Sequence, residues 1–409
     1  MLDDVPFFDL ITMAPQDVMH VILEGGLAHE TRLFIEHCVA MQYFTLDQLN
    51  TAIQDFDYGY AERSNRPSVI TVAHIQAPVT TLGNQKGAPF SLSEYNLLSR
   101  FNILDDLMFF RGWCSKKKKK IIMCLLASQL WLLSRVLLLI VDQWVPQHDL
   151  HRFSYRLHLA ILYAALAPEV HPQTPGILEN LIHVHHLLFR LIYPNVQITP
   201  KLHYYLHLPS ILRRDGPTRW ICCLRYEAKH QRFKELFLEG NHLNPCKTLC
   251  QREENLQALR FVQIPGQLPP DVLADVEFSQ LIVLPPQHPL LQMVLQMHAA
   301  PLNGLALCER ATIDGTLFKC NRCVVRVHGP QPEFVFLTDI ITNGVETYFH
   351  GELMQVIGFR DDLQLYEVAH TLHQRLTHVR HCATVQALML WREGNRLFLS
   401  DRTSDRSFF

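Results

Sequence analysis

Two short segments of the chain place a carboxylate three residues before a histidine. In the first segment Asp17 precedes His20, and Glu24 follows seven residues after Asp17. In the second segment, about two hundred residues later, Glu227 precedes His230. Residues three or four positions apart share one face of a helix, so each acid is expected beside its histidine. Two acids that a fold brings together can hold a divalent metal ion, and such ions drive phosphoryl transfer.

Each segment also has a plainer interpretation. The first can be a surface helix capped by Asp17, because a carboxylate at a helix N-terminus accepts bonds from free backbone N–H groups. The second can be a solvated helix with charge pairs between residues four apart. It lies in a basic region, since residues 201 to 234 contain eight Lys or Arg and two acids. Cations around Glu227 would lower its pKa and keep the carboxyl group ionised.

The composition is that of a globular protein. Of the 409 residues, 48% are hydrophobic and 19% are charged, and the length is sufficient for two or three domains. The formal net charge of −2 argues against a protein that coats nucleic acid with its whole surface, but it permits a local basic patch. The eleven cysteines follow no framework of spacings, and the first residues resemble no secretory signal. We therefore expect free thiols in a reducing compartment.

One stretch, Ile121 to Val141, is almost wholly apolar and follows the lysine run Lys116 to Lys120. A membrane span with a positive flank has this form. Arg135 lies within the stretch, however, and a charge at mid-span costs several kcal/mol in lipid. We therefore expect a buried helix and no membrane partner. The lysine run is expected to be a solvated loop or helix start, with a nuclear-import or phosphate-binding patch as the alternative.

Hydrophobic periodicity predicts helices in the first half of the chain. Apolar residues recur at helical spacing from Leu27 to Phe56, and residues 57 to 93 read as irregular. Proline and Asp/Ser signals then separate a set of antiparallel helices, which include Ile121 to Trp144, Ser154 to Leu166 and Pro175 to Tyr193. A further helix is expected from Cys222 to Glu239.

The pattern changes near Gly304. Short runs rich in Val, Phe, Thr and Tyr, split by Gly, Pro and Asn, predict a small β-barrel or sandwich. The expected strands are Leu317 to Lys319, Val324 to Val327, Phe334 to Leu337, Thr347 to Phe349 and Glu352 to Phe359. The last forty residues are expected to be partly helical.

Several longer motifs follow one another along the chain. Phe8-Asp9 and "APQDVMHVILEGG" come first, then "ASQLWLLSRVLLLI", "VPQHD", "PNVQITPKLHYYLHLPSIL", "GPTRW" and "RYEAKHQRFK". In this order they resemble transposases of the CACTA (En/Spm) type, in particular the animal branch of transposon-derived proteins. The resemblance covers most of residues 1 to 240. The β-rich stretch around "YEVAH" resembles the tail of the same proteins more weakly.

The resemblance implies a mixed, mainly α-helical fold. Part of a ribonuclease-H-like core would be interrupted by a long helical insertion and followed by a small, barrel-like β-rich module. The implied divisions are a partial core (1–56), the insertion (57–198), a returning core helix (199–240), a connector (241–303), the β-rich module (304–370) and a tail (371–409).

Three catalytic acids are implied for such a core. Asp17 matches the second acid and Glu227 the third, and the two would share Mg²⁺ ions that activate a water or a 3′-hydroxyl. His20, Glu24 and His230 would support them. The expected partner is DNA, in the nucleus, with homo-oligomers an open alternative. Candidate contacts to DNA phosphates are Lys201, Arg213, Arg214, Arg225, Lys229, Arg232 and Lys234.

The sequence departs from the family pattern at its start. It begins just before the second-acid motif, and the family's first acid and cysteine-rich metal-binding stretch are not in it. Asp3, Asp4 and Asp9 are too close to Asp17 to replace a residue on a different strand. A site that lacks one of three metal ligands loses most of its activity, so we expect this chain alone to be inactive.

Other functions stay open on the sequence. One is a non-catalytic DNA- or chromatin-binding protein derived from a transposase. Another is a carboxylate-bridged di-metal oxidase, for which Glu179 is the obvious further acid, and a third is a membrane protein. Cys320 and Cys323 form a CxxC pair that favours a hairpin turn over a zinc site, because no second pair exists. His183, His185 and His186 are expected to be core or interface histidines.

Overall fold

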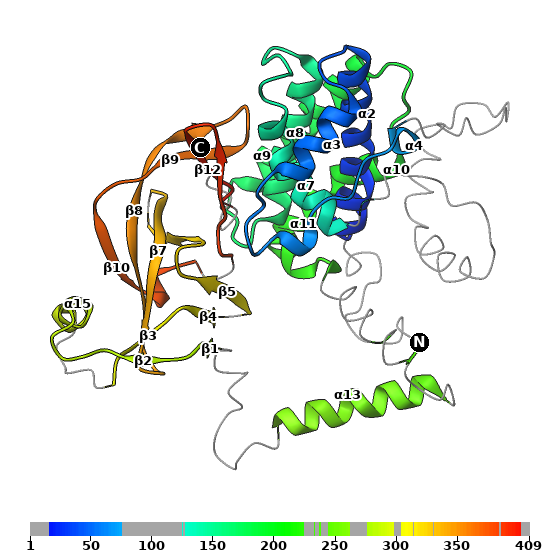
Figure 1. Ribbon diagram of the computed structural model, residues 1–409. Coiled ribbons are helices and arrows are strands. Elements are labelled where there is room, and N and C mark those ends of the chain that lie inside the picture. Colours follow the sequence, from blue (N-terminus) through cyan, green and yellow to red (C-terminus); the bar gives the residue numbers. More distant parts are fainter. Residues whose placement is uncertain are drawn as a thin grey trace.

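The computed structural model divides into two folded parts (Figure 1). It describes residues 16–75, 125, 127–224, 233, 237–238, 244–261, 276–297, 304–313, 315–329, 331–383 and 386–401. The helical domain comprises the described residues up to 224, and the β domain comprises those from 276 onwards. Helix α13 (Pro245–Phe261) lies apart from both in Figure 1.

The helical domain is a bundle whose principal members are α2, α8 and α9. Its elements are η1 (Met19–Leu27, a π-helix), α2 (Ala28–Ala40), α3 (Leu46–Asp55), η2 (Arg63–Asn65), α4 (Val72–Ile75), α7 (Ala127–Ile140), α8 (Leu150–Leu166), α9 (Thr174–Ile192), α10 (Pro200–Tyr204), η5 (Tyr205–His207), α11 (Leu208–Asp215) and η6 (Thr218–Ile221).

The helix boundaries follow from local capping chemistry. Thr45 and Gln48 form a capping box at the start of α3, in which each side chain bonds the other's backbone N–H. Asp149 accepts bonds from two backbone N–H groups at the start of α8, which therefore begins before the predicted Ser154. Pro175 stands in the first turn of α9, where its missing N–H costs nothing. The predicted helices 154–166 and 175–193 are confirmed.

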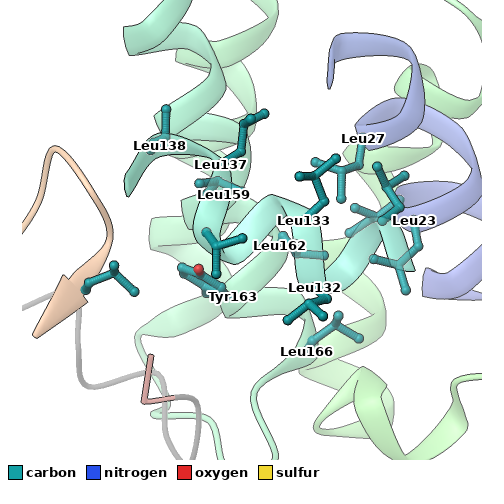
Figure 2. Packing of buried hydrophobic residues seen from close by; sticks show 14 of the residues in the cluster. Leu23, Leu27, Leu132, Leu133, Leu137, Leu138, Leu159, Leu162, Tyr163 and Leu166 are labelled. Carbon is teal, nitrogen blue, oxygen red and sulfur yellow. The ribbon is translucent and has the colours of Figure 1, made fainter. Parts of the chain in front are cut away.

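The apolar stretch of the sequence forms the buried helix α7. Figure 2 shows Leu132, Leu133 and Leu137 packed between leucines of η1 and α8. Arg135 within this helix is 5% exposed and forms an ion pair with Glu62. Among the described helices, none combines the length and apolarity that crossing a membrane requires. Lys116 to Lys120 lie outside the described residues.

Strands begin only at Val276 in the described part of the chain. Residues 16 to 56, predicted to belong to a ribonuclease-H-like core, form η1, α2 and α3 there. In the described part of the insertion, residues 57–71 are irregular apart from η2, as predicted, and the rest is mainly helical. The ribonuclease-H-like core therefore stays a prediction, while the mixed, largely helical character is present.

The β domain is built from antiparallel pairs. Its elements are β1 (Val276–Phe278), β2 (Ile282–Val283), α15 (Pro289–Met297), β3 (Ala306–Cys308), β4 (Arg310–Ile313), β5 (Thr316–Lys319), β6 (Val324–Val327), β7 (Glu333–Thr342), β8 (Thr347–Arg360), β9 (Leu365–Ala369), β10 (Gln374–His378), η7 (Val379–His381), β11 (Leu390–Glu393) and β12 (Arg396–Leu399). One sheet has the order β1-β4-β5, and the larger has β11-β12-β9-β8-β7-β3-β2, with β10 on β8 and β6 on β7.

Three features of the β domain differ from the sequence prediction. The two strands predicted around Gly351 are one strand, β8, which crosses the glycine without a break. The segment after residue 370, predicted to be partly helical, is mainly β10, β11 and β12, and its helical part among the described residues is the short 3-10 helix η7. Strands β11 and β2 stand at opposite ends of the larger sheet, so the pairings do not confirm a closed barrel.

The helical and β domains contact one another directly. Tyr60 donates its hydroxyl hydrogen to the carbonyl of Leu317, at 2.6 Å. Arg156 on α8 pairs with Asp361 at 2.7 Å. The guanidinium of Arg135 lies over the ring of Trp391, 5.7 Å from its centroid. These contacts hold the β domain against the side of the bundle that carries α7 and α8.

Candidate functional site

Asp17 lies immediately before the π-helix η1 and caps its first turn. Its carboxylate accepts bonds from the backbone N–H groups of Met19 at 3.3 Å and His20 at 3.1 Å. Asp17 thus caps the helix start, as the plainer interpretation predicts, but the prediction of a surface helix was wrong, because seven of the nine residues of η1 are buried. The same carboxylate lies 2.5 Å from Nδ1 of His20, so the acid and its histidine do share one face. Burial raises the pKa of Asp17, but the hydrogen bonds from His20 and Cys223 outweigh it, and the net shift is downward.

The Asp17 carboxylate also contacts the start of the second segment. The backbone N–H of Cys223 donates to Oδ1 of Asp17 at 2.9 Å, across 206 residues of sequence. Glu227 follows Cys223 by four residues. Glu227 and His230 themselves lie outside the described residues, as do Arg225, Lys229, Arg232 and Lys234. The convergence of Asp17 with Glu227 therefore stays a prediction, and the described contact is that of Asp17 with Cys223, four residues before Glu227.

Lys201 packs against the end of η1. Its ammonium donates to the backbone carbonyl of Glu24 at 3.3 Å, while the Glu24 side chain is exposed. A Cβ on Gly25 would lie 2.6 Å from Cδ of Lys201, so a glycine is required for this approach. Desolvation lowers the pKa of Lys201, although the negative charges of Glu24 and Asp17 act to raise it. Lys201 is therefore a half-buried cation next to the Asp17 site.

The two remaining basic candidates in the described part of the chain are exposed and paired. Arg213 contacts Glu179 at 2.8 Å, and Arg214 contacts Asp215 at 2.6 Å. A DNA phosphate would have to replace a carboxylate at each guanidinium. Because Glu179 is exposed and bound to Arg213, it does not supply the inward carboxylate that the di-metal oxidase alternative requires.

The donor atoms around Asp17 do not by themselves fit Mg²⁺. Asp17, His20 and Cys223 offer a carboxylate oxygen, an imidazole nitrogen and a thiol within 4.8 Å of one another. Mg²⁺ prefers oxygen ligands, whereas nitrogen and sulfur suit zinc and similar ions. Among the described residues of this group there is one carboxylate, so a magnesium site here would depend on Glu227.

A second polar cluster joins α2 to the start of α8. Oδ2 of Asp149 accepts bonds from Nε2 of His37 at 2.9 Å and from the hydroxyl of Tyr43 at 3.1 Å. The rings of His37 and His151 stack with centroids 3.5 Å apart. Burial raises the pKa of Asp149, but the hydrogen bonds from His37 and from the backbone N–H of Arg152 lower it by more, so the net shift is downward.

Replacing Asp149 with asparagine tests the charge at this cluster. Asparagine can keep the cap through its carbonyl oxygen, but its amide group cannot accept the bonds that His37 and Tyr43 make with Oδ2. We therefore expect a loss of about 1–2 kcal/mol at pH 7. Because the pKa of Asp149 is lowered in the folded state, its contribution is fully present above its unfolded value, about 3.9, and is lost as the pH falls further. The difference in the free energy of unfolding between the wild type and Asp149→Asn should therefore shrink below about pH 4, as measured by urea unfolding. The control Asp47→Asn, in the exposed first turn of α3, should change the free energy of unfolding little at any pH. A loss for Asp149→Asn that does not vary with pH would contradict a stabilising role for the charge of Asp149.

The sequence did not predict the most buried polar cluster, which is centred on Glu30. Glu30 on α2, His158 on α8 and His185 on α9 are each 0% exposed. Nδ1 of His158 and Nε2 of His185 both contact Oε2 of Glu30, the second at 2.7 Å. The hydroxyl of Ser154 donates to Oε1 at 2.6 Å. The prediction that His185 is a core histidine is confirmed.

One local signal in the sequence pointed to Glu30. It occupies the apolar stripe that runs through Leu27, Phe34 and Cys38 at helical spacing, where a charged residue is unusual. Its partners are 128 and 155 residues away, so nothing local identifies them.

The CxxC pair does not form the predicted hairpin. Cys320 follows β5, which pairs with β4, and Cys323 precedes β6, which pairs with β7. The turn between them thus connects two sheets. The thiol of Cys320 lies 3.5 Å from the carbonyl of Cys308, and that of Cys323 lies 3.3 Å from the carbonyl of Lys319. Neither belongs to a group of described residues that could hold a metal ion.

Comparison with known proteins adds no relative to this picture. No family model matches the sequence, and no curated protein or solved structure matches it either. The likeness to CACTA-type transposases therefore stays a prediction that depends on the motifs themselves.

Proposed function

We propose that this chain is part of a transposon-derived DDE transposase, and that on its own it binds DNA without cutting it. The observation that carries the proposal is the bond between the Asp17 carboxylate and the backbone of Cys223. It brings Asp17, to which the resemblance assigns the second acid, to a residue four positions before Glu227, to which it assigns the third. A protein of this kind would act in the nucleus, on DNA.

The charge around this junction supports binding to a phosphate backbone. Lys201 lies close enough to Asp17 for their charges to interact, and Arg225, Lys229, Arg232 and Lys234 follow Cys223 directly in the sequence. Attraction between Lys or Arg and phosphates accounts for most sequence-independent DNA binding. The net charge of −2 for the whole chain makes such a region a local feature.

Strand cleavage is not expected, because the carboxylate of Asp17 is already committed to the fold. Oδ1 accepts bonds from the backbones of Met19 and Cys223, and Oδ2 accepts from the backbone and ring of His20. Two bonds at each oxygen occupy the acceptor positions of a carboxylate. A metal ion at Asp17 would have to displace at least one of them.

DNA binding measured against salt concentration tests the proposal. The variant with Arg225, Lys229, Arg232 and Lys234 replaced by alanine should lose affinity for duplex DNA of random sequence. Its slope of log K against log salt should be shallower by about 3–4, because each lost phosphate contact removes about 0.9. Asp17→Ala should still bind, and neither protein should cut DNA in the presence of Mg²⁺ or Mn²⁺. Fluorescence anisotropy and nicking of supercoiled DNA are suitable measurements.

The matched control removes four exposed arginines of the β domain, Arg310, Arg322, Arg375 and Arg380. This control should bind DNA like the wild type. Equal losses in both variants, or a wild type without salt-dependent binding, would refute the basic segment as a DNA-binding surface. Cleavage that disappears in Asp17→Ala would show instead that the chain carries an active site.

A further inference from the structure

The Glu30 cluster brings three potential metal ligands to one point inside the helical domain. The donor atoms are a carboxylate oxygen of Glu30, Nδ1 of His158 and Nε2 of His185, and all lie within 4.8 Å of one another. Each comes from a different helix, and each side chain is 0% exposed. Two imidazole nitrogens and one carboxylate oxygen are the donors of a typical site for Zn²⁺ or a similar transition-metal ion.

Further contacts hold two of these side chains in position. Nε2 of His158, on the far side of the ring from Glu30, lies 2.7 Å from the hydroxyl of Tyr205. The second carboxylate oxygen of Glu30 accepts a bond from Ser154. A histidine that binds a metal through one nitrogen usually engages a hydrogen-bond partner through the other, which fixes its tautomer and orientation. His158 has this arrangement.

The charge of Glu30 requires compensation. Within the described residues, Glu30 pairs with no Lys or Arg, and its ion-pair partners are His158 and His185 alone. Nδ1 of His185 is buried without a hydrogen-bond partner among the described residues. Neutral imidazoles are the form that binds metals, and a bound cation would balance the carboxylate.

We propose that Glu30, His158 and His185 form a structural Zn²⁺ site that ties α2, α8 and α9 together. The ion would take the place of the hydrogens between Oε2 of Glu30 and the two rings, with water as the fourth ligand. Each neutral ring would then carry its proton on the nitrogen that faces away from Glu30, which is Nε2 of His158, beside the hydroxyl of Tyr205, and Nδ1 of His185. Complete burial of the ligands argues for a structural role, because a catalytic ion needs a position that substrate can reach. Mg²⁺ and Ca²⁺ are disfavoured because they take mainly oxygen ligands.

Such an ion would stabilise the fold by linking distant parts of the chain. In the sequence, Glu30 is 128 residues from His158 and 155 residues from His185. The unfolded chain cannot hold the three donors together, so the free energy of binding adds to the stability of the folded state. Removing the ion should therefore loosen the packing of α2 against α8 and α9.

Metal analysis of the full chain tests the proposal. The wild type, dialysed against chelator and reloaded with Zn²⁺, should retain the ion after gel filtration and melt at a higher temperature than the metal-free protein. Co²⁺ in place of Zn²⁺ should give the visible absorption of a tetrahedral site. Glu30→Gln and His185→Gln should lose the retained ion and the increase in melting temperature.

Matched controls lie on the same helices. Glu36→Gln on α2 and His183→Gln on α9 change exposed residues of the same types, and both should retain Zn²⁺. A wild type that binds no Zn²⁺, or cluster variants that bind it as well as the controls, would overturn the site. If the cluster variants do not fold, the double variant His20→Gln/His37→Gln tests whether the ion is bound elsewhere. It removes one ligand from each of the two other groups of described residues that could hold a metal ion, Asp17–His20–Cys223 and His37–Asp149–His151. Retention of Zn²⁺ in that protein supports the Glu30 site, and its loss refutes it.

Discussion

Glu30→Ala is expected to lower the free energy of unfolding of the metal-free protein by about 3–5 kcal/mol. The substitution leaves Ser154, His158 and His185 without the acceptor that they share, in a place that water does not reach. Each buried group that loses its partner costs about 1–3 kcal/mol, and the deleted side chain leaves a cavity besides. Urea unfolding followed by far-ultraviolet circular dichroism measures the change.

The matched control is Glu36→Ala, on the same helix. The Glu36 side chain is 47% exposed and pairs with Arg32 at 3.0 Å. Arg32 is buried but keeps its bond to the carbonyl of Ile75, and a pair with one half-exposed partner contributes about 1 kcal/mol, so this variant should lose much less stability than Glu30→Ala. Similar losses in the two proteins would mean that the Glu30 cluster adds nothing to stability beyond an ordinary helical glutamate.

Gly26→Ala is expected to destabilise the protein by about 2–3 kcal/mol or more, although alanine is the better helix former. A Cβ at this position would lie 2.2 Å from the hydroxyl oxygen of Tyr205 and 2.9 Å from a methyl group of Leu202. Tyr205 is fully buried and is held by its contact with His158, so it has little freedom to move away. Displacing Tyr205 would therefore also disturb His158.

Gly176→Ala is the control for this effect. Gly176 lies in α9, and a Cβ there would meet no atom within 4 Å. Its replacement should leave stability unchanged or raise it by up to about 1 kcal/mol, because alanine reduces the entropy of the unfolded chain. Thermal unfolding of both variants distinguishes steric conflict from helix propensity, and equal melting temperatures would contradict the predicted conflict at Gly26.

The sequence predicted those elements whose signals are local. Helices α8 and α9 were found because Pro168 and Pro175 mark two of their ends and apolar residues recur within them, whereas the cap Asp149 at the start of α8 was missed. The break predicted at Gly351 was wrong for a reason that only the sheet reveals. A Cβ there would lie 2.0 Å from the carbonyl oxygen of Phe336, so the glycine permits a close approach of β7 and does not interrupt β8.

The candidate site, too, was predictable only where its contacts are local. The pairing of Asp17 with His20 follows from a spacing of three residues, and the structure has it. The contact of Asp17 with Cys223 is not local, and the resemblance to a family with widely separated acids was what directed attention to that region. No such guide existed for Glu30, His158 and His185, whose proximity depends on how three helices pack.

The π-helical form of η1 sets the angular relation between Asp17 before it and Glu30 beyond it. Successive residues of an α-helix are about 100° apart around the axis, whereas i→i+5 bonding widens each turn and reduces that angle. Over the nine residues of η1 the difference accumulates. A return to α-helical winding at the same length would therefore turn the Asp17 carboxylate away from Cys223 while Glu30 kept its place in the core, so the winding of this segment positions the contact between Asp17 and Cys223.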